Sequence, residues 1–188
     1  MTDKASLRTQ MLAKRAAIPS ATKLEAAAAI ANHFADHPYL TYSRSFAGYY
    51  ATRNELDVLP IFNRMSRFTK VMSLPITQLD SRLLLFRRWA PGQPLELGPH
   101  GIKIPPADAE AIIPEIILVP LLAFTPDGYR LGYGGGYYDT TIKELRKMQN
   151  PPLFFGVAYT QQEVVNIETE PHDQKLDGIL TQDGVSMF

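Results

Sequence analysis

The segment ILVPLLAFTPDGYRLGYGGGYYD, residues 117–139, constrains the fold more than any other part of the chain. It continues an apolar, β-branched run over residues 115–119 that ends at a proline, a pattern typical of a parallel strand buried on both faces. Residues 126–128, Pro-Asp-Gly, predict a turn, because Pro fixes one φ angle and Gly tolerates the positive φ that follows. Four glycines then fall within residues 132–136, and a helix is expected over residues 140–148.

A strand, a glycine-rich loop and a helix start together predict a phosphate site. Glycines let the backbone approach an anion closely, and the free N–H groups of the first helical turn point at it. Arg130 can add a bidentate contact, and Asp139 near the first turn can hold a divalent cation that bridges phosphates. The loop lacks both the Lys-Ser/Thr of a Walker A motif and the glycine spacing of a dinucleotide site. The alternative is a flexible surface loop.

This segment resembles the signature of the 5-formyltetrahydrofolate cyclo-ligases, also called 5,10-methenyltetrahydrofolate synthetases. The matching residues are Val119-Pro120, Ala123-Phe124, Gly128 and the whole run from Arg130 to Asp139. In that family the segment binds ATP and a magnesium ion. The resemblance therefore implies a metal role for Asp139 and ATP contacts by Arg130, Leu131, Gly132, Tyr133, Gly134, Gly135, Gly136, Tyr137 and Tyr138.

The composition is that of one globular domain spanning residues 1–188, with 45% hydrophobic and 20% charged residues. Nineteen basic residues balance nineteen acidic ones, so the net charge gives no indication of a nucleic-acid partner. The absence of cysteine excludes disulfides and thiolate chemistry. No signal-peptide core is visible, and the longest apolar run, residues 116–124, is too short to span a bilayer. We therefore expect a cytoplasmic protein with no membrane partner.

The N-terminal residues 3–17 predict a helix with an apolar stripe beside a basic one. Leu7 and Met11 are four residues apart, and so are Lys4 and Arg8. A solvated charged face is the alternative explanation for the two basic side chains. The family resemblance favours a functional one, since the family opens with Lys-x-x-x-Arg, whose side chains reach the ATP phosphates. We therefore predict that Lys4 and Arg8 bind ATP.

Two further helices are expected before residue 70. The first would begin at Ser20, a plausible N-cap, and end at His37-Pro38. His33 and His37 stand four residues apart, but no third ligand is adjacent, so we discard a metal site there. The second helix would follow Asp57 as a possible cap, with its inward side chains at Leu59, Phe62 and Met65.

Glu55 is predicted to lie between the strand over residues 45–50 and the next helix, where α/β proteins place ligands. A loop glutamate taken alone is usually just solvated. The family has a glutamate at this place that contacts the pterin part of the folate. The resemblance therefore implies substrate binding by Glu55 and, with a less specific match, by Tyr50.

The remaining pattern alternates strands with helices. Strands are expected over residues 70–75, 82–86 and 153–158, the second of them antiparallel, and a terminal hairpin over residues 179–188. Such alternation predicts an α/β protein with a parallel or mixed sheet covered on both faces. The resemblance implies the three-layer α/β/α fold, with a mostly parallel sheet, of sugar-phosphate isomerases and CoA transferases.

The family resemblance also implies a second metal ligand near the C-terminus. A His-Asp pair precedes the last core strand in the family, and its Asp helps to hold magnesium, which assigns this role to Asp173. Asp177 is the reserve metal ligand, although a cap or a solvated turn is the preferred interpretation for it. Two positions depart from the family pattern: Ile104 stands where relatives tend to carry Glu, and Thr140 where they often carry Arg.

The resemblance implies ATP- and Mg²⁺-dependent conversion of 5-formyltetrahydrofolate to 5,10-methenyltetrahydrofolate, with release of ADP and phosphate. Phosphoryl transfer of this kind depends on positioning and charge neutralisation, so we assign no general base. We expect a monomer. One alternative is a folate- or nucleotide-binding protein without turnover, motivated by Ile104 and Thr140. Another is a phosphosugar isomerase, for which the sequence offers no evident enolising base.

Overall fold

The computed structural model describes residues 3–68 and 70–188. In chain order its helices and strands are α1 (Lys4–Ala16), α2 (Ser20–Asp36), α3 (Pro38–Thr41), β1 (Ser45–Ala47), α4 (Leu59–Met65), β2 (Val71–Ile76), β3 (Leu85–Arg88), β4 (Glu96–Leu97), β5 (Lys103–Ile104), β6 (Ala111–Ile112), β7 (Ile116–Pro120), β8 (Ala123–Phe124), β9 (Arg130–Leu131), α5 (Tyr137–Leu145), β10 (Leu153–Val157), β11 (Gly178–Thr181) and β12 (Gly184–Met187). Short 3₁₀ turns lie at Pro99–Gly101 and Thr160–Gln162.

The central sheet has eight strands in the order β12-β11-β10-β7-β1-β2-β3-β6. Strands β11, β10, β7, β1 and β2 run parallel to one another. Strands β12, β3 and β6 are antiparallel to their neighbours and form the two edges. The mostly parallel sheet, an antiparallel strand after β2 and the C-terminal hairpin are therefore as the sequence predicts. The antiparallel strand spans Leu85–Arg88 rather than residues 82–86.

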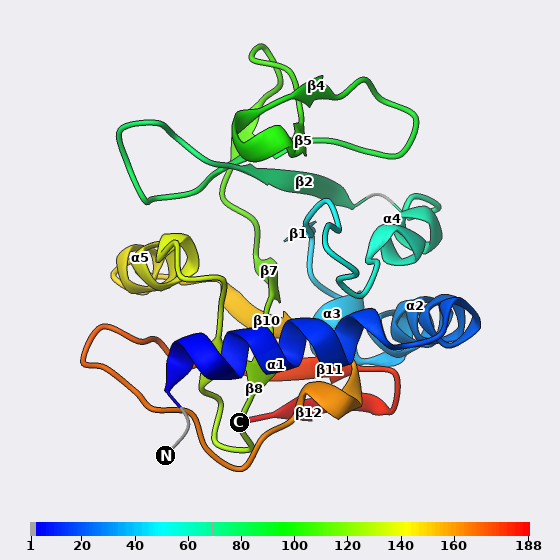
Figure 1. Ribbon diagram of the computed structural model, residues 1–188. Coiled ribbons are helices and arrows are strands. Elements are labelled where there is room, and N and C mark those ends of the chain that lie inside the picture. Colours follow the sequence, from blue (N-terminus) through cyan, green and yellow to red (C-terminus); the bar gives the residue numbers. More distant parts are fainter. Residues whose placement is uncertain (1–2, 69) are drawn as a thin grey trace.

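The sheet is covered on both faces, with α2 and α4 on one side and α5 on the other (Figure 1). The alternation along β7 decides which side chain meets which layer. Leu118 belongs to the cluster that contains Phe34 of α2, whereas the next residue, Val119, belongs to the cluster that contains Ile142 of α5. The predicted three-layer α/β/α arrangement is confirmed.

Helix α1 belongs to neither layer and crosses in front of the sheet in Figure 1. Its first turn is capped by Asp3, whose Oδ1 accepts hydrogen bonds from the N–H groups of Ala5 (2.8 Å) and Ser6 (3.0 Å). Its buried Met11 packs with Leu122 and with Leu131 of β9, beyond the carboxyl end of β7. This packing sets the basic side chains of α1 beside the glycine-rich loop.

The starts of α2 and α5 differ from the sequence prediction. Ser20 is the first residue of α2 rather than its N-cap, and Pro19, in the cap position, offers no side-chain hydrogen bond. Helix α5 begins at Tyr137 instead of residue 140, because Gly136 adopts a left-handed conformation (φ 71°) and starts the helix immediately. The Tyr-Tyr-Asp run therefore forms the first helical turn.

The prediction that Leu59 points inward is also wrong, since its side chain is 40% exposed. Phe62 and Met65 are buried as predicted, and Ile61 is buried with them. Successive helical residues are rotated by about 100°, so Leu59 lies roughly 110° away from the centre of this buried side. Val58, rather than Asp57, occupies the cap position of α4. Asp57 still supports the helix start, since its Oδ1 accepts a hydrogen bond from the Leu59 N–H at 2.9 Å.

Candidate active site

A cleft of about 870 Å³ opens where the central parallel strands β1 and β7 end, the usual place for ligands in α/β proteins. Its walls come from α1, the loop after β1, the loop after β2, the glycine-rich loop with α5, and the segment around residue 172. Apart from the reserve metal ligand Asp177, every residue predicted to bind ATP, substrate or metal lines this one cleft: Lys4, Arg8, Tyr50, Glu55, Arg130, Leu131, Gly132, Tyr133, Gly134, Gly135, Gly136, Tyr137, Tyr138, Asp139 and Asp173.

The glycine-rich loop has a backbone that other residues adopt only with strain. Gly134 (φ 93°) and Gly136 (φ 71°) both lie in the left-handed region, where a Cβ atom is unfavourable. The Arg8 guanidinium lies against Gly134, and Arg8 Nε donates a hydrogen bond to the Gly132 carbonyl oxygen at 2.9 Å. Arg8 therefore fixes the loop while its remaining guanidinium nitrogens stay at the cleft wall.

Arg130 is the most deeply buried cation of the cleft, with its side chain only 4% exposed. Its Nη1 donates to the Gln174 carbonyl oxygen (2.6 Å) and its Nη2 to Asp139 Oδ1 (2.9 Å). Burial lowers the pKa of Arg130, and the charge of Asp139 opposes that shift, so the guanidinium stays protonated. Arg130 thus anchors Asp139 and the segment before β11. Its contact with phosphate stays a prediction.

Lys4 forms ion pairs across the cleft with two carboxylates, Asp173 Oδ2 at 2.8 Å and Glu170 Oε1 at 2.9 Å. Burial lowers the pKa of Lys4, but the hydrogen bonds to Asp173 and Glu170 outweigh it, and the net shift is upward. Burial raises the pKa of Asp173, but the hydrogen bonds from Lys4 and from the Glu170 N–H reverse the shift, and the net change is downward. Both groups are therefore charged at neutral pH.

The two predicted metal ligands, Asp139 and Asp173, each face a cation of the chain. Over residues 3–68 and 70–188, no three His, Cys, Asp or Glu side chains are grouped so that they could hold a metal ion. Mg²⁺ usually keeps several waters and binds one or two carboxylates together with substrate phosphates. The donor set therefore suits a magnesium ion that arrives with a nucleotide better than a preformed cage.

Asp177, the reserve metal ligand, is not among the side chains that line the cleft. Its Oδ2 accepts a hydrogen bond from the Phe154 N–H at 2.8 Å, and its Oδ1 pairs with Arg146 Nη2 at 3.0 Å. These contacts join the start of β10 to the residue after α5. Asp177 is therefore placed to stabilise the fold, although it is not a helix cap, because strand β11 follows it.

Glu55 is held by three hydrogen bonds at the end of the cleft formed by the loop after β1. Its Oε2 accepts from the Thr52 N–H (2.7 Å) and hydroxyl (3.2 Å), and its Oε1 accepts from the Tyr133 hydroxyl (2.7 Å). Tyr50 lies on the same loop, 38% exposed, and the Lys103 ammonium sits 5.5 Å from the centre of its ring. The two predicted substrate residues are thus brought together at one end of the cleft.

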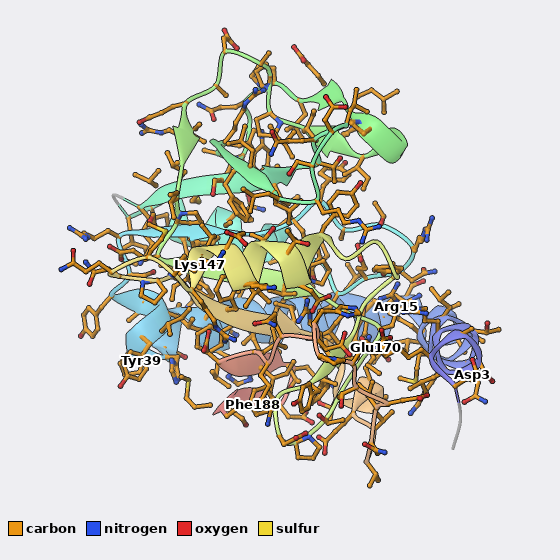
Figure 2. The ribbon with its side chains drawn as sticks, turned by 90° about the vertical axis from the view of Figure 1, so that its left-hand side faces the viewer. Asp3, Arg15, Tyr39, Lys147, Glu170 and Phe188 are labelled. Atoms are coloured by element: carbon orange, nitrogen blue, oxygen red, sulfur yellow. The ribbon has the colours of Figure 1, made fainter. Side chains whose placement is uncertain are left out.

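Arg15 does not itself line the cleft, but it is a supporting residue that the sequence prediction missed. It is almost fully buried (1% exposed), and its Nη2 donates to the Tyr133 hydroxyl at 2.5 Å. The spacing did contain a signal, because Arg15 follows Leu7 and Met11 at four-residue intervals and so continues the apolar stripe of α1. Figure 2 views α1 end-on and shows Arg15 on the side that faces the sheet.

Arg82, also unpredicted, reaches the cleft from the loop between β2 and β3. Its Nη1 would lie 3.4 Å from a Cβ atom added to Gly136, so the guanidinium stands at the start of α5. Ile104 and Thr140, where we expect a departure from the family pattern, line the same cleft. The Ile104 side chain packs against Gly98, where an added Cβ atom would approach it to 2.6 Å.

Sequence comparison now identifies the family. The model of the 5-formyltetrahydrofolate cyclo-ligase family matches residues 1–182. The chain belongs to this family. The cyclo-ligase of Haemophilus influenzae is 28% identical over 179 residues, which cover 93% of this chain and 95% of that protein. The cyclo-ligase of Escherichia coli K12 is 27% identical over 173 residues, which cover 89% of this chain and 94% of that protein.

Solved structures of the cyclo-ligase family agree with this assignment. The 5,10-methenyltetrahydrofolate synthetase of Aquifex aeolicus superposes with a TM-score of 0.82 at 27% identity, covering 98% of this chain and 92% of that one. The synthetase of Mycoplasma pneumoniae gives a TM-score of 0.75 at 24% identity, over 96% and 99% of the two chains, and at that identity supports the fold alone. The predicted fold and enzyme class are therefore confirmed.

Membership of the cyclo-ligase family also implies ATP-dependent activity on a folate, which matches the kinds of residue that line the cleft. Among the helices described in residues 3–68 and 70–188, none is long and apolar enough to cross a membrane.

Proposed function

We propose that this chain uses ATP and Mg²⁺ to cyclise 5-formyltetrahydrofolate to 5,10-methenyltetrahydrofolate, releasing ADP and phosphate. The observation that carries the proposal is the single cleft in which the glycine-rich loop, the basic side chains of α1 and the Glu55 carboxylate meet. One end offers backbone amides and cations for a polyphosphate. The other offers a fixed carboxylate and aromatic side chains for a pterin.

The chemical problem is that a formamide oxygen is a poor leaving group. Transfer of the γ-phosphoryl group of ATP to the formyl oxygen converts that oxygen into part of a phosphate ester, and ADP departs. The lone pair of N10 then attacks the formyl carbon and closes the ring. The carbon–oxygen bond breaks, phosphate leaves with the former formyl oxygen, and N10 loses its proton.

The phosphoryl transfer requires positioning and charge neutralisation more than a dedicated nucleophile. Lys4 and Arg8 are the proposed cationic contacts to the phosphates, and Lys4 would exchange its present partners, Asp173 and Glu170, for them. The N–H groups of the glycine-rich loop and the first turn of α5 would receive phosphate oxygens. Arg130 would contribute mainly by holding Asp139 at the cleft wall.

Asp139 and Asp173 are the proposed carboxylate ligands of the magnesium ion, which would neutralise phosphate charge when bound. On the substrate side, Glu55 accepts hydrogen bonds from N–H groups, and a pterin ring presents such groups on its edge. Tyr50 at the rim is placed to cover the ring. No general base is proposed. All of the proposed contacts come from one chain, and a monomer stays an expectation.

The test is the absorbance of the methenyl-folate product with purified protein, 5-formyltetrahydrofolate, ATP and Mg²⁺. We expect a rise that requires all of these components. No rise with folded protein, combined with measurable nucleotide or folate binding, would favour a binding protein without turnover. Conversion of a phosphosugar without nucleotide would favour an isomerase.

A further inference from the structure

The Tyr133 hydroxyl joins two parts of the cleft that the sequence treats as separate. Tyr133 belongs to the glycine-rich loop, yet its hydroxyl lies 2.7 Å from Glu55 Oε1 and 2.5 Å from Arg15 Nη2. Arg15 comes from α1, the helix that also carries the proposed phosphate ligands. A single chain of hydrogen bonds therefore runs from α1 through the glycine-rich loop to the proposed folate ligand.

The direction of these hydrogen bonds is fixed by the chemistry of the partners. A guanidinium can only donate, so the Tyr133 oxygen accepts from Arg15 and its single proton points to Glu55. Burial first, and then the charge of Glu55, raises the pKa of Tyr133 well above its ordinary value. The phenol thus stays protonated throughout the physiological pH range and remains a donor to the carboxylate.

The loop that carries Glu55 needs such support, because its backbone is strained. Arg53 (φ 48°) and Asn54 (φ 61°) are two successive non-glycine residues in the left-handed region. Arg15 Nη2 donates to the Arg53 carbonyl oxygen at 2.7 Å, and Lys23 Nζ donates to Asn54 Oδ1 at 3.0 Å. Arg15 therefore holds both the backbone of this loop and the hydroxyl that orients its carboxylate.

The ring of Tyr133 has a separate packing role. The guanidinium carbons of Arg15 and Arg53 each lie 5.6 Å from its centroid, a distance suited to cation–π contact. Phenylalanine at this position would keep both contacts and lose only the hydroxyl. The orienting role of the hydroxyl can therefore be separated experimentally from the packing of the ring.

We propose that Arg15 and Tyr133 are positioning residues that hold the Glu55 carboxylate ready for the folate substrate. The inference rests on the proposed function, in which Glu55 binds the pterin. It implies that the loop that receives ATP also sets the geometry of the folate end, so the hydroxyl of Tyr133 serves the folate rather than the nucleotide.

The first test is Tyr133→Phe, with Tyr129→Phe as its matched control. Tyr129 directly precedes β9, is absent from the cleft lining and has its ring against Lys175. For Tyr133→Phe we expect the KM for 5-formyltetrahydrofolate to rise about tenfold, which corresponds to about 1.4 kcal/mol. The kcat and the KM for ATP should stay within about twofold, a split that general damage to the fold would not give. Tyr129→Phe should change none of the three.

The second readout does not depend on turnover. The Thr52 N–H donates to Glu55, so its hydrogen exchange reports how firmly the carboxylate is held. Tyr133→Phe should accelerate Thr52 exchange about tenfold. Arg15→Lys should act in the same direction, because a lysine lacks the planar guanidinium whose Nη2 donates to both Tyr133 and Arg53 while its Nη1 donates to Leu121.

These two readouts distinguish the possible failures. In an active enzyme, an unchanged folate KM for Tyr133→Phe would overturn the inference, as would Thr52 exchange within twofold of the unmodified protein. If the unmodified protein gives no turnover while Tyr133→Phe still accelerates Thr52 exchange, the proposed function fails and the positioning of Glu55 stands.

Discussion

Replacing Asp139 by alanine should lower the free energy of unfolding by about 3 kcal/mol. Asp139 Oδ1 accepts one hydrogen bond from the buried Arg130 guanidinium and one from the Gln174 N–H. Both hydrogen bonds are made to a charged carboxylate, and at this partly exposed side chain each contributes about 1.5 kcal/mol. The substitution also leaves the buried Arg130 guanidinium without its carboxylate partner, which is unfavourable for a buried charge, although its hydrogen bond to the Gln174 carbonyl oxygen remains.

The assay is urea unfolding followed by the fluorescence of Trp89, the chain's single tryptophan, which is buried against Phe62. A matched control is Glu144→Ala on the same helix, whose i,i+3 ion pair with Lys147 is exposed and should contribute less than about 0.5 kcal/mol. A loss below about 1 kcal/mol for Asp139→Ala would show that Arg130 does not depend on this carboxylate. The proposed metal role adds a second expectation, loss of turnover even at high Mg²⁺.

The other predictions concern the N-terminal cation and the glycine-rich loop. Lys4→Met should raise the KM for ATP. It should also raise the pKa of Asp173, because the hydrogen bond from the lysine then no longer outweighs burial, which opposes ionisation of the carboxyl group. NMR titration of Asp173 checks this shift, and an unmoved pKa would contradict it. Since the pKa of Asp173 is lowered in the folded protein, the carboxylate contributes stability at pH values above its ordinary pKa of 3.8, and this contribution is lost as the pH falls below that value. Lys4→Met should therefore weaken the loss of stability at acid pH, which denaturation at varied pH measures. Gly136→Ala should destabilise the protein by about 1–2 kcal/mol, because the residue has a left-handed φ. Gly132→Ala, where an added Cβ atom meets nothing within 4 Å, should cost little, and equal losses for the two glycines would refute this account.

The sequence predicted which residues gather in the cleft better than it predicted local boundaries. The glycine-rich run, Arg130 and Asp139 are close together in the chain, so one strand–loop–helix pattern was sufficient to group them. Glu55 and Asp173 come from distant segments, and their place beside that loop rested on the family resemblance. Sequence spacing alone cannot show that these segments lie side by side. Their proximity follows from the strand order of the sheet, which is set by long-range pairing of β1 with β7 and of β10 with β11.

The residues that were missed share one cause: their roles depend on partners far away in the chain. Arg15 lies within the helix predicted over residues 3–17, yet its partners, Leu121, Arg53 and Tyr133, come from three other segments. The exposed Leu59 has a simpler explanation. Its three-residue spacing from Phe62 resembles an apolar face, but the rotation of about 100° per residue places Leu59 outside the buried side of the helix.

The most direct test of the central claim is to follow the formyl oxygen. If the cleft transfers the γ-phosphoryl group to that oxygen, a substrate carrying ¹⁸O in the formyl group must deliver the label to inorganic phosphate. We therefore expect one labelled oxygen in each phosphate released in a single turnover with ATP and Mg²⁺. Label recovered in water, with unlabelled phosphate, would contradict the mechanism even if methenyl-folate were formed.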